Sequence, residues 1–459
     1  MRPFESINPT TEVKLQEYPF TSKIQSEQML EKGVLAYQQW RNLDFNERAE
    51  PILKLGELLK SNADELAKMV SMEMGKLFTH AKAEILKSAT LCEYYARQSE
   101  ELLKPEITQV DETHEVCISY EPIGIVLGIF PWNFPYWQIL RSAIPILMSG
   151  NGILVKPAPN VPQSSLALQN LVNQSGFPAG IYQTIFAGEE LVAELIADDR
   201  IAATTLTGSE AAGSAVAAQS GKHIKHSVLE LGGSDPLIVL NDAPLDETIE
   251  QAVFARFQNN GQSCVAAKRF LVQREIAELF TQKLIAASEK LILGDPQSAD
   301  TNIGPLARKD LLELLTKQVN DSVESGAQII FQSQQKTANG FFYPPTILTN
   351  IPEGSRAYKE ELFGPVISLF TFHTDEEAIA IANDTKYGLG ASIYSTDISR
   401  AKRLASKIES GMVYINQIVK SDVRFPFGGV KKSGYGREIG SFGLKSFCNV
   451  KSVWVRNSQ

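Results

Sequence analysis

The feature that most constrains the fold of this chain is a regular alternation of short apolar runs with amphipathic stretches. An apolar run rich in β-branched residues ends at Phe130, a helical stretch follows at 136–148, and further apolar runs occupy 153–157 and 236–240. Glycine and proline bound these runs, which are short enough for strands. Strands that alternate with helices in this way predict a parallel sheet with helices on both faces.

A second series of the same kind begins after Leu240. Helices are expected at 245–259 and 275–290, with short strands at KRFLVQ, AQIIFQ, VISLF and ASIYS. Helical periodicity also fills the region from Glu27 to Leu103. A chain of 459 residues has room for two or three lobes of ordinary size. The predicted fold class is therefore α/β, with two doubly wound lobes.

Two further segments fit neither lobe. The sequence around 113–124 indicates an outer strand or hairpin, and the last fifteen residues indicate an extended strand. A tail of this sort often adds to the edge of a partner's sheet.

Composition excludes several classes of protein. The chain carries 53 acidic and 44 basic residues, and the basic ones are dispersed, so neither a nucleic acid nor an anionic membrane is an expected partner. The N-terminal residues lack a basic segment followed by an apolar run, and no stretch of ~18 apolar residues occurs. We expect a cytoplasmic protein.

Neither a disulfide framework nor a metal site is expected. The four cysteines are too few for such a framework and none form a CxxC pair. Of the five histidines only His223 and His226 stand close together, so no zinc site is predicted.

Cys264 is the one cysteine whose surroundings favour chemistry. It follows Asn-Asn-Gly-Gln, a turn-forming run between a helix and a strand, where backbone N–H groups are exposed. We expect a reachable thiol whose thiolate is favoured by backbone dipoles. The alternative is a buried cysteine that packs as a small apolar residue.

Two polar residues stand in unusual settings. Glu230 lies in an apolar strand that runs into a glycine pair, where burial would raise its pKa toward that of a general base; pairing with a helix end is the alternative. Asn133, between two prolines, would hold its amide rigidly as a donor, or simply form a turn.

The sequence has no standard phosphate-binding loop. Neither G-x-G-x-x-G after a strand nor G-x-x-x-x-G-K-[ST] is present. Gly208 and Gly213 precede an Ala-rich helix, whose N-terminus offers a weaker signal for a pyrophosphate site.

Seven motifs together identify a family. FPWNFP, VKPAPN, TGSEAAG, LELGGSDP, NNGQSC, ELFGPV and FGGVKKSGYGRE stand in the order and spacing of the NAD(P)-dependent aldehyde dehydrogenase superfamily, and the resemblance covers essentially the whole chain. PWNFPYWQILR, VLELGGSDPLIVLND and a late FCNV are most similar to the shorter bacterial succinate-semialdehyde dehydrogenases.

The resemblance implies oxidation of an aldehyde to a carboxylate through a thioester. Cys264 would be the nucleophile, Glu230 the base that activates water, and Asn133 a donor to the oxyanion. Glu438 matches an acidic position that the family uses to support proton relay, although a surface ion pair is an equally ordinary role.

The resemblance also implies a nicotinamide cofactor, with NADP slightly favoured over NAD. NAD-preferring relatives place a glutamate where this chain has Pro159, and its loss removes roughly 1 to 3 kcal/mol of repulsion against a 2′-phosphate. The other implied cofactor-binding residues are Trp132, Lys156, Gly208, Ser209, Leu231, Glu361 and Phe363.

Three positions bear on the substrate, which the resemblance implies is succinic semialdehyde. Arg141 matches an arginine that grips its distal carboxylate, unless it is a helix residue facing solvent, and Ser421 matches a serine that helps. Longer relatives carry a second arginine where this chain has Gln258. Broad specificity, glutaric semialdehyde, transfer to coenzyme A and cofactor-independent thiol esterase activity are the alternatives.

The family resemblance implies a domain plan and self-association. Residues 1–112 and 131–231 would form the dinucleotide-binding domain and 232–425 the catalytic domain. Residues 113–130 and 444–459 would be oligomerisation strands, and 426–443 would return to the first lobe. A homodimer or homotetramer is expected.

Overall fold

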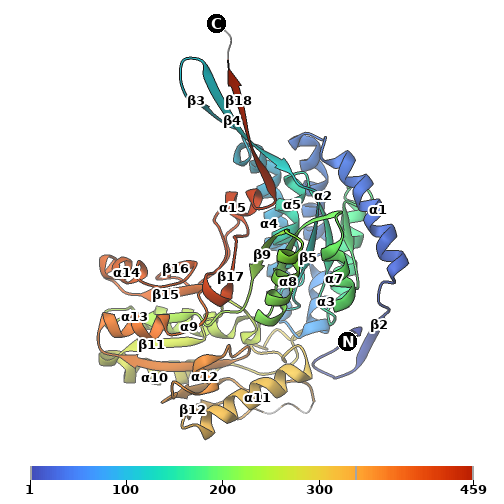
Figure 1. Ribbon diagram of the computed structural model, residues 1–459. Helices are drawn as coiled ribbons and strands as arrows, with labels where there is room; N and C mark the ends of the chain where they lie inside the picture. Colours follow the sequence, from blue (N-terminus) through green and yellow to red (C-terminus); the bar gives the residue numbers. More distant parts are fainter. Residues whose placement is uncertain (1–2, 336, 338, 457–459) are drawn as a thin grey trace.

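Two helix-covered sheets and a projecting arm make up the protein. The structure is a computed structural model that describes residues 3–335, 337 and 339–456. Figure 1 shows the two lobes beside each other, with the arm extending from the lobe that contains the N-terminal half of the chain. Residues 1–2 and 457–459, which end two of the expected ranges, and positions 336 and 338 lie outside the described residues.

The first lobe contains a six-stranded sheet that is parallel except at one edge. Its strand order is β17-β9-β8-β5-β6-β7. The strands β6 and β7, which follow β5 in the chain, are added on one side of it, and β8 and the strand that follows it are added on the other side. This reversal creates a crevice between β5 and β8 at their carboxyl ends. The strands are β5 (Ile125–Ile129), β6 (Gly152–Lys156), β7 (Tyr182–Thr184), β8 (Ile201–Thr207), β9 (His226–Glu230) and the antiparallel β17 (Gly434–Tyr435).

Helices cover both faces of this sheet (Figure 1). The expected helical region near the N-terminus forms four helices, two of which begin with capping boxes, at Ser22 with Gln25 and at Asp44 with Glu47. The helices of this lobe are α1 (Lys23–Trp40), α2 (Phe45–Ser61), α3 (Ala63–Met74), α4 (Phe78–Leu102), α5 (Trp137–Met148), α6 (Pro162–Gln174), α7 (Glu189–Ala197), α8 (Glu210–Lys222) and α15 (Gly440–Lys445), and a ribbon of β1 (Phe4–Ile7) and β2 (Lys14–Tyr18) precedes them.

Helix α5 is the buried centre of the first lobe. Every one of its residues is buried, as its mostly apolar sequence WQILRSAIPILM requires. It packs against α4, which carries the wall of the site described below.

The second lobe contains a seven-stranded sheet, parallel except for its edge strand β12. Its strand order is β12-β13-β14-β11-β10-β15-β16. The strands are β10 (Pro236–Val239), β11 (Arg269–Gln273), β12 (Gln328–Gln332), β13 (Thr346–Thr349), β14 (Val366–Phe372), β15 (Gly390–Tyr394) and β16 (Met412–Ile415). The helices are α9 (Leu245–Phe257), α10 (Arg274–Ser288), α11 (Lys309–Glu324), α12 (Arg356–Lys359), α13 (Asp375–Asn383) and α14 (Ile398–Ala405), with 3₁₀ turns η1 (Gln258–Gly261) and η2 (Lys431–Ser433).

The arm is a three-stranded antiparallel sheet of order β18-β4-β3. Its strands are β3 (Glu106–Gln109), β4 (His114–Pro122) and β18 (Cys448–Arg456). The expected range 113–130 is wrong at its end, because residues 125–129 form β5 in the middle of the first sheet. The break falls at Gly124, which has a φ of 139°. β3, expected in the first lobe, belongs to the arm.

The turn formed by residues 259–261 lies where the two lobes meet. All three residues have left-handed φ angles, of 52°, 57° and 75°, which is why α9 ends two residues before the expected position. The Asn260 amide donates to the carbonyl of Gly75 (2.8 Å) in the first lobe and to that of Pro305 (3.0 Å). The turn is thereby fastened to both lobes.

No helix in the described part of the chain is long and apolar enough to cross a membrane.

Two glycines with positive φ provide a matched test of this junction. A methyl group at Gly261 would overlap the carbonyl group of Gly364 and lie 2.7 Å from the nitrogen of Pro365, whereas one at Gly176 meets nothing within 4 Å. We expect Gly176→Ala to lower the free energy of unfolding by about 1 to 2 kcal/mol, from backbone strain alone. Gly261→Ala should cost clearly more, because the backbone must shift as well. Urea denaturation of both variants measures this, and equal losses would contradict it.

Candidate active site

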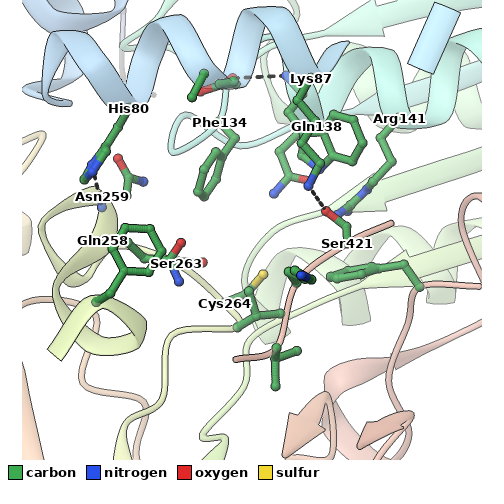
Figure 2. Close-up of a pocket in the computed structure, with 18 residues that line it drawn as sticks. His80, Lys87, Phe134, Gln138, Arg141, Gln258, Asn259, Ser263, Cys264 and Ser421 are labelled. Carbon is green, nitrogen blue, oxygen red and sulfur yellow. Dashed lines mark hydrogen bonds between the residues drawn. The ribbon is translucent and has the colours of Figure 1, made fainter. Parts of the chain in front are cut away.

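A cavity of about 210 Å³ lies at this junction (Figure 2). Helices α4 and α5 form one wall, the loop between η1 and β11 forms the opposite wall, and residues 419–421 close one side. Four of the residues singled out from the sequence line the cavity, namely Arg141, Gln258, Cys264 and Ser421. Three others, Asn133, Glu230 and Glu438, do not line it.

The loop that carries Cys264 is tied to Asn133. The Asn133 amide donates to the carbonyl of Gln262 (3.1 Å), and the Asn259 amide donates to the carbonyls of Asn133 and Gln262 (both 2.9 Å). An amide nitrogen carries two hydrogens, so Asn133 retains one for another acceptor. The expected proximity of Asn133 to the cysteine loop is thus observed.

Cys264 is a partly buried, free thiol. Burial raises its pKa to about 12, while the charges of Arg141 and Lys268 act in the opposite direction. The direction of this shift is opposite to the expected effect of backbone dipoles, because removal from water disfavours the thiolate. Formation of the nucleophile requires a proton acceptor or a change in these surroundings.

Glu230 ends β9 and is buried away from the cavity. Neither carboxyl oxygen has a hydrogen-bond partner in the described structure, and a methyl group at Gly428 would lie only 2.5 Å from Oε1. Burial, reinforced by the charge of Glu438, raises the pKa of Glu230 well above its usual value. This direction is the one expected from the sequence, and the side chain does not line the cavity that contains Cys264.

Arg141 and Glu438 form a buried ion pair behind the cavity wall. The Arg141 side chain is 2% exposed, which excludes the solvent-facing alternative, and Glu438 is 4% exposed, so its ion pair is not a surface one. Ser142 also donates to Glu438. The guanidinium lies 4.3 Å from the centre of the Phe427 ring, and its Nη2 has no hydrogen-bond partner in the described structure.

Two basic residues in the wall were missed by the sequence reasoning. Lys87, on α4, donates to the Ser421 hydroxyl (2.6 Å) and lies 4.2 Å from the centre of the Trp137 ring. Burial lowers its pKa to about 8. Burial together with the charge of Lys76 lowers the pKa of His80 to about 4, so His80 is neutral. An amphipathic helix gives no signal that such residues face a cavity.

Lys268, a further basic residue, links the loop of Cys264 to Glu361, one of the expected cofactor-binding residues. Its Nζ donates to the carbonyls of Cys264 (2.7 Å) and Ser263 (3.0 Å) and forms an ion pair with Glu361 (3.0 Å). Glu361 in turn accepts from the backbone N–H of Gly233 (3.1 Å). No sequence motif pointed to this lysine.

The expected cofactor-binding residues gather at one edge of the first sheet. Lys156 ends β6, Gly208 follows β8, and the segments holding Trp132 and Leu231 follow β5 and β9. This is the carboxyl edge of parallel strands, next to the crevice between β5 and β8, where doubly wound sheets bind ligands. Phe363 of the second lobe faces the same edge, with its ring centre 5.8 Å from that of Trp132.

The residues at this edge suit a dinucleotide. Gly208 and Ser209 stand before the 13-residue helix α8, where unpaired N–H groups attract a pyrophosphate. The hydroxyl of Thr207 is buried there without a partner in the described structure. Burial lowers the pKa of Lys156 to about 8, and the neighbouring Pro159 has no carboxylate to repel a phosphate. Within the described residues, no cluster of three metal-binding side chains occurs.

Comparisons with known proteins agree with this geometry. A sequence model of the aldehyde dehydrogenase family matches residues 1–453. The chain is 45% identical to a probable NADP⁺-dependent succinate-semialdehyde dehydrogenase of Synechocystis sp., over 98% of this chain and 99% of that protein. It is 43% identical to the NAD(P)⁺-dependent succinate semialdehyde dehydrogenase Sad of Escherichia coli, over 98% and 97%.

Among solved structures, succinic semialdehyde dehydrogenase from Streptococcus pyogenes in complex with NADP⁺ is similar, with a TM-score of 0.97 and 34% identity over 99% of this chain and 100% of that one. The similarity therefore extends through both lobes and the arm. A thiol between two lobes, a tethered amide beside it and a dinucleotide-type sheet edge are all present. The chain belongs to the aldehyde dehydrogenase family.

Proposed function

We propose that this protein oxidises succinic semialdehyde to succinate with NADP⁺ or NAD⁺ as the oxidant. The observation that carries the proposal is the cavity itself, which holds the Cys264 thiol and three lysine or arginine side chains, Arg141, Lys87 and Lys420, among mostly apolar walls. Basic groups in an apolar cavity favour a substrate that is itself anionic. The names of the relatives from Synechocystis sp. and Escherichia coli support the same substrate.

The chemistry assigned to the side chains begins at the thiol. After deprotonation, Cys264 Sγ attacks the aldehyde carbon, and the carbonyl oxygen becomes an alkoxide. The remaining hydrogen of the Asn133 amide and backbone N–H groups stabilise that charge. When bound, NAD(P)⁺ supplies the hydride acceptor, and the chain then holds the acyl group as a thioester on Cys264. The residues that would hold the cofactor are Lys156, Gly208 and Ser209 on one lobe and Glu361 and Phe363 on the other.

Hydrolysis of the thioester is assigned to Glu230. A carboxyl group with a raised pKa accepts a proton from water near neutral pH, which is the property a general base needs. In this proposal the side chain rotates from its place beside Gly428 toward the cavity that contains Cys264. Glu438, which raises the pKa of Glu230 and pairs with Arg141, is suited to relay the proton.

NADP⁺ is the cofactor we favour slightly. Pro159 stands where a glutamate would repel the 2′-phosphate, and Lys156 is a cation at the same sheet edge. The Synechocystis sp. relative is named for NADP⁺ and the Escherichia coli relative for both cofactors.

We also propose that the arm pairs with a second copy of the chain, in a homodimer or homotetramer. It projects from the body, and β18 exposes 61% of Val450 and 64% of Trp454. These two residues lie on one face of the strand because they are four positions apart. An exposed apolar face on a projecting sheet favours burial against a partner.

The substrate and cofactor are tested by one panel. Succinic semialdehyde, glutaric semialdehyde and butanal, each with NAD⁺ and NADP⁺, should give the highest kcat/KM for succinic semialdehyde, with NADP⁺ at least as good as NAD⁺. A charged distal contact is worth about 10- to 100-fold over the neutral aldehyde. The readout is the formation of reduced nicotinamide, followed by its absorbance. Butanal equal to succinic semialdehyde, or turnover of an activated ester alone, would overturn the proposal.

Glu230→Gln separates the two halves of the reaction. The variant should still reduce one cofactor per site in a burst, then turn over about 10²- to 10⁴-fold more slowly than the parent, because only hydrolysis has lost its base. Stopped-flow absorbance measures both phases. Cys264→Ser is the control and should show no burst. A Glu230→Gln enzyme with unchanged steady-state kcat would remove this residue from the mechanism.

Self-association is tested at the arm. The double substitution Val450→Lys and Trp454→Lys should reduce the mass measured by light scattering toward the 50.6 kDa of one chain, because it places charges on the proposed contact. Leu279→Lys is the matched control, since Leu279 is a 48% exposed apolar residue on α10 of the second lobe. An unchanged mass in the arm variant, or a monomeric parent, would contradict the proposal.

A further inference from the structure

Lys87 lies at the boundary between two hollows. It lines the cavity that contains Cys264, and it also lines a larger surface depression of about 700 Å³ beside α4. Ser421 is the other residue that both hollows share. Figure 2 shows the Lys87–Ser421 hydrogen bond between α4 and the loop of Ser421, on the opposite side of the cavity from His80. The pair therefore stands at the mouth of the site.

The charge of Lys87 is not neutralised by any carboxylate within ion-pair distance in the described structure. Its contacts are the uncharged hydroxyl of Ser421 and the face of Trp137. Glu84, one helical turn away, is already bound by Lys76. Lys87 is partly buried, and a partly buried, unpaired ammonium is costly, so an anion is the ligand that removes the cost.

The two acidic groups nearest to Lys87 are committed elsewhere. The second carboxyl oxygen of Glu84 accepts the backbone N–H groups of Tyr136 (2.9 Å) and Trp137 (3.0 Å). Asp422 forms an ion pair with Arg424 (2.7 Å). Both carboxylates therefore have partners of their own.

Arg141 alone cannot pair fully with the carboxylate of an anionic substrate. It is paired with Glu438, so only part of its guanidinium is free. Position 258, where an arginine would add a second cation, holds the neutral Gln258. Two lysines from other elements also line the cavity, the exposed Lys420 next to Ser421 and the partly buried Lys87 on α4. Of these two, Lys87 is the one that is hydrogen-bonded to Ser421.

We propose that Lys87 and Ser421 together hold the distal carboxylate of the substrate at the mouth of the cavity, while its aldehyde carbon lies at Cys264. In this arrangement the Lys87–Ser421 hydrogen bond is replaced by two bonds to the carboxylate, one from the ammonium and one from the hydroxyl. The inference deepens the proposed function and rests on it. It makes Lys87 a residue that determines specificity.

Loss of the Lys87 charge should then be visible in the pH dependence of binding. Its pKa is lowered to about 8 by burial and by Arg141, against Asp422 and Glu84, with a smaller lowering from Lys420. As the pH rises through 8, the ammonium becomes neutral and its attraction for an anion disappears. KM for succinic semialdehyde should rise over this range, and KM for butanal should not follow it.

Lys87→Met, Lys87→Arg and Lys82→Met form the test set. Lys82 lies on the same helix, is 41% exposed and pairs with Asp64, so it is the matched control. We expect Lys87→Met to reduce the ratio of kcat/KM for succinic semialdehyde over butanal by about 10- to 100-fold and to abolish the rise in KM above pH 8. Lys87→Arg should restore part of the ratio, and Lys82→Met should keep all of it. Thermal melting checks that each variant is folded.

The outcomes separate the two proposals. A parent enzyme that does not prefer succinic semialdehyde over butanal overturns the proposed substrate. A parent that does prefer it, with a Lys87→Met variant of unchanged ratio, overturns only the role of Lys87. If Lys87→Met fails to fold, Ser421→Ala and the pH profile of the parent decide. If the pair binds the carboxylate, the substitution Ser421→Ala and a rise in pH above 8 must each weaken the preference for the anionic aldehyde.

Discussion

Removal of water from the junction between the lobes is the constraint on which the rest of the structure depends. Burial raises the pKa of the Cys264 thiol and the Glu230 carboxyl, and it lowers the pKa of the Lys87 ammonium. Each shift moves the group toward its uncharged form, as expected where the dielectric constant is low. Groups that keep their charge nearby are paired, as Arg141 is with Glu438. The junction therefore contains groups whose protonation responds to the binding of a charged ligand.

The fold explains why this junction forms where it does. The site lies between the carboxyl edge of the first sheet and the amino edge of the second, because β9 passes directly into β10 through residues 231–235. The backbone there is closely packed. A methyl group at Gly233 would lie 2.9 Å from the carbonyl oxygen of Cys264, so the connection between the lobes also supports the nucleophile loop. Lys268 extends that support to Glu361.

Much of this arrangement could be predicted from local sequence. Period and turn residues indicate many strands of both sheets, although β13 and β16 were not expected, and Asn-Asn-Gly before Cys264 indicates a turn. Features that depend on tertiary packing could not be predicted. The local sequence indicates a hairpin that ends at 124, but the arm range implied by the family resemblance ran on to 130 and so included β5 of the first sheet. The thiolate was expected because a turn suggests exposure, whereas burial at the junction raises the pKa of the thiol.

The same limit explains why Lys87 escaped notice while Arg141 did not. Arg141 was identified because it matches a family position, whereas no family position pointed to Lys87, and a lysine on the amphipathic α4 predicts only a solvated face. The two cations are also suited to different depths. A guanidinium stays charged and can contact Glu438 and a ligand at the same time, so it tolerates the buried position of Arg141. An ammonium titrates when it is buried, and its place beside the outer depression leaves it a route to water. The depth of each cation therefore follows from its own chemistry.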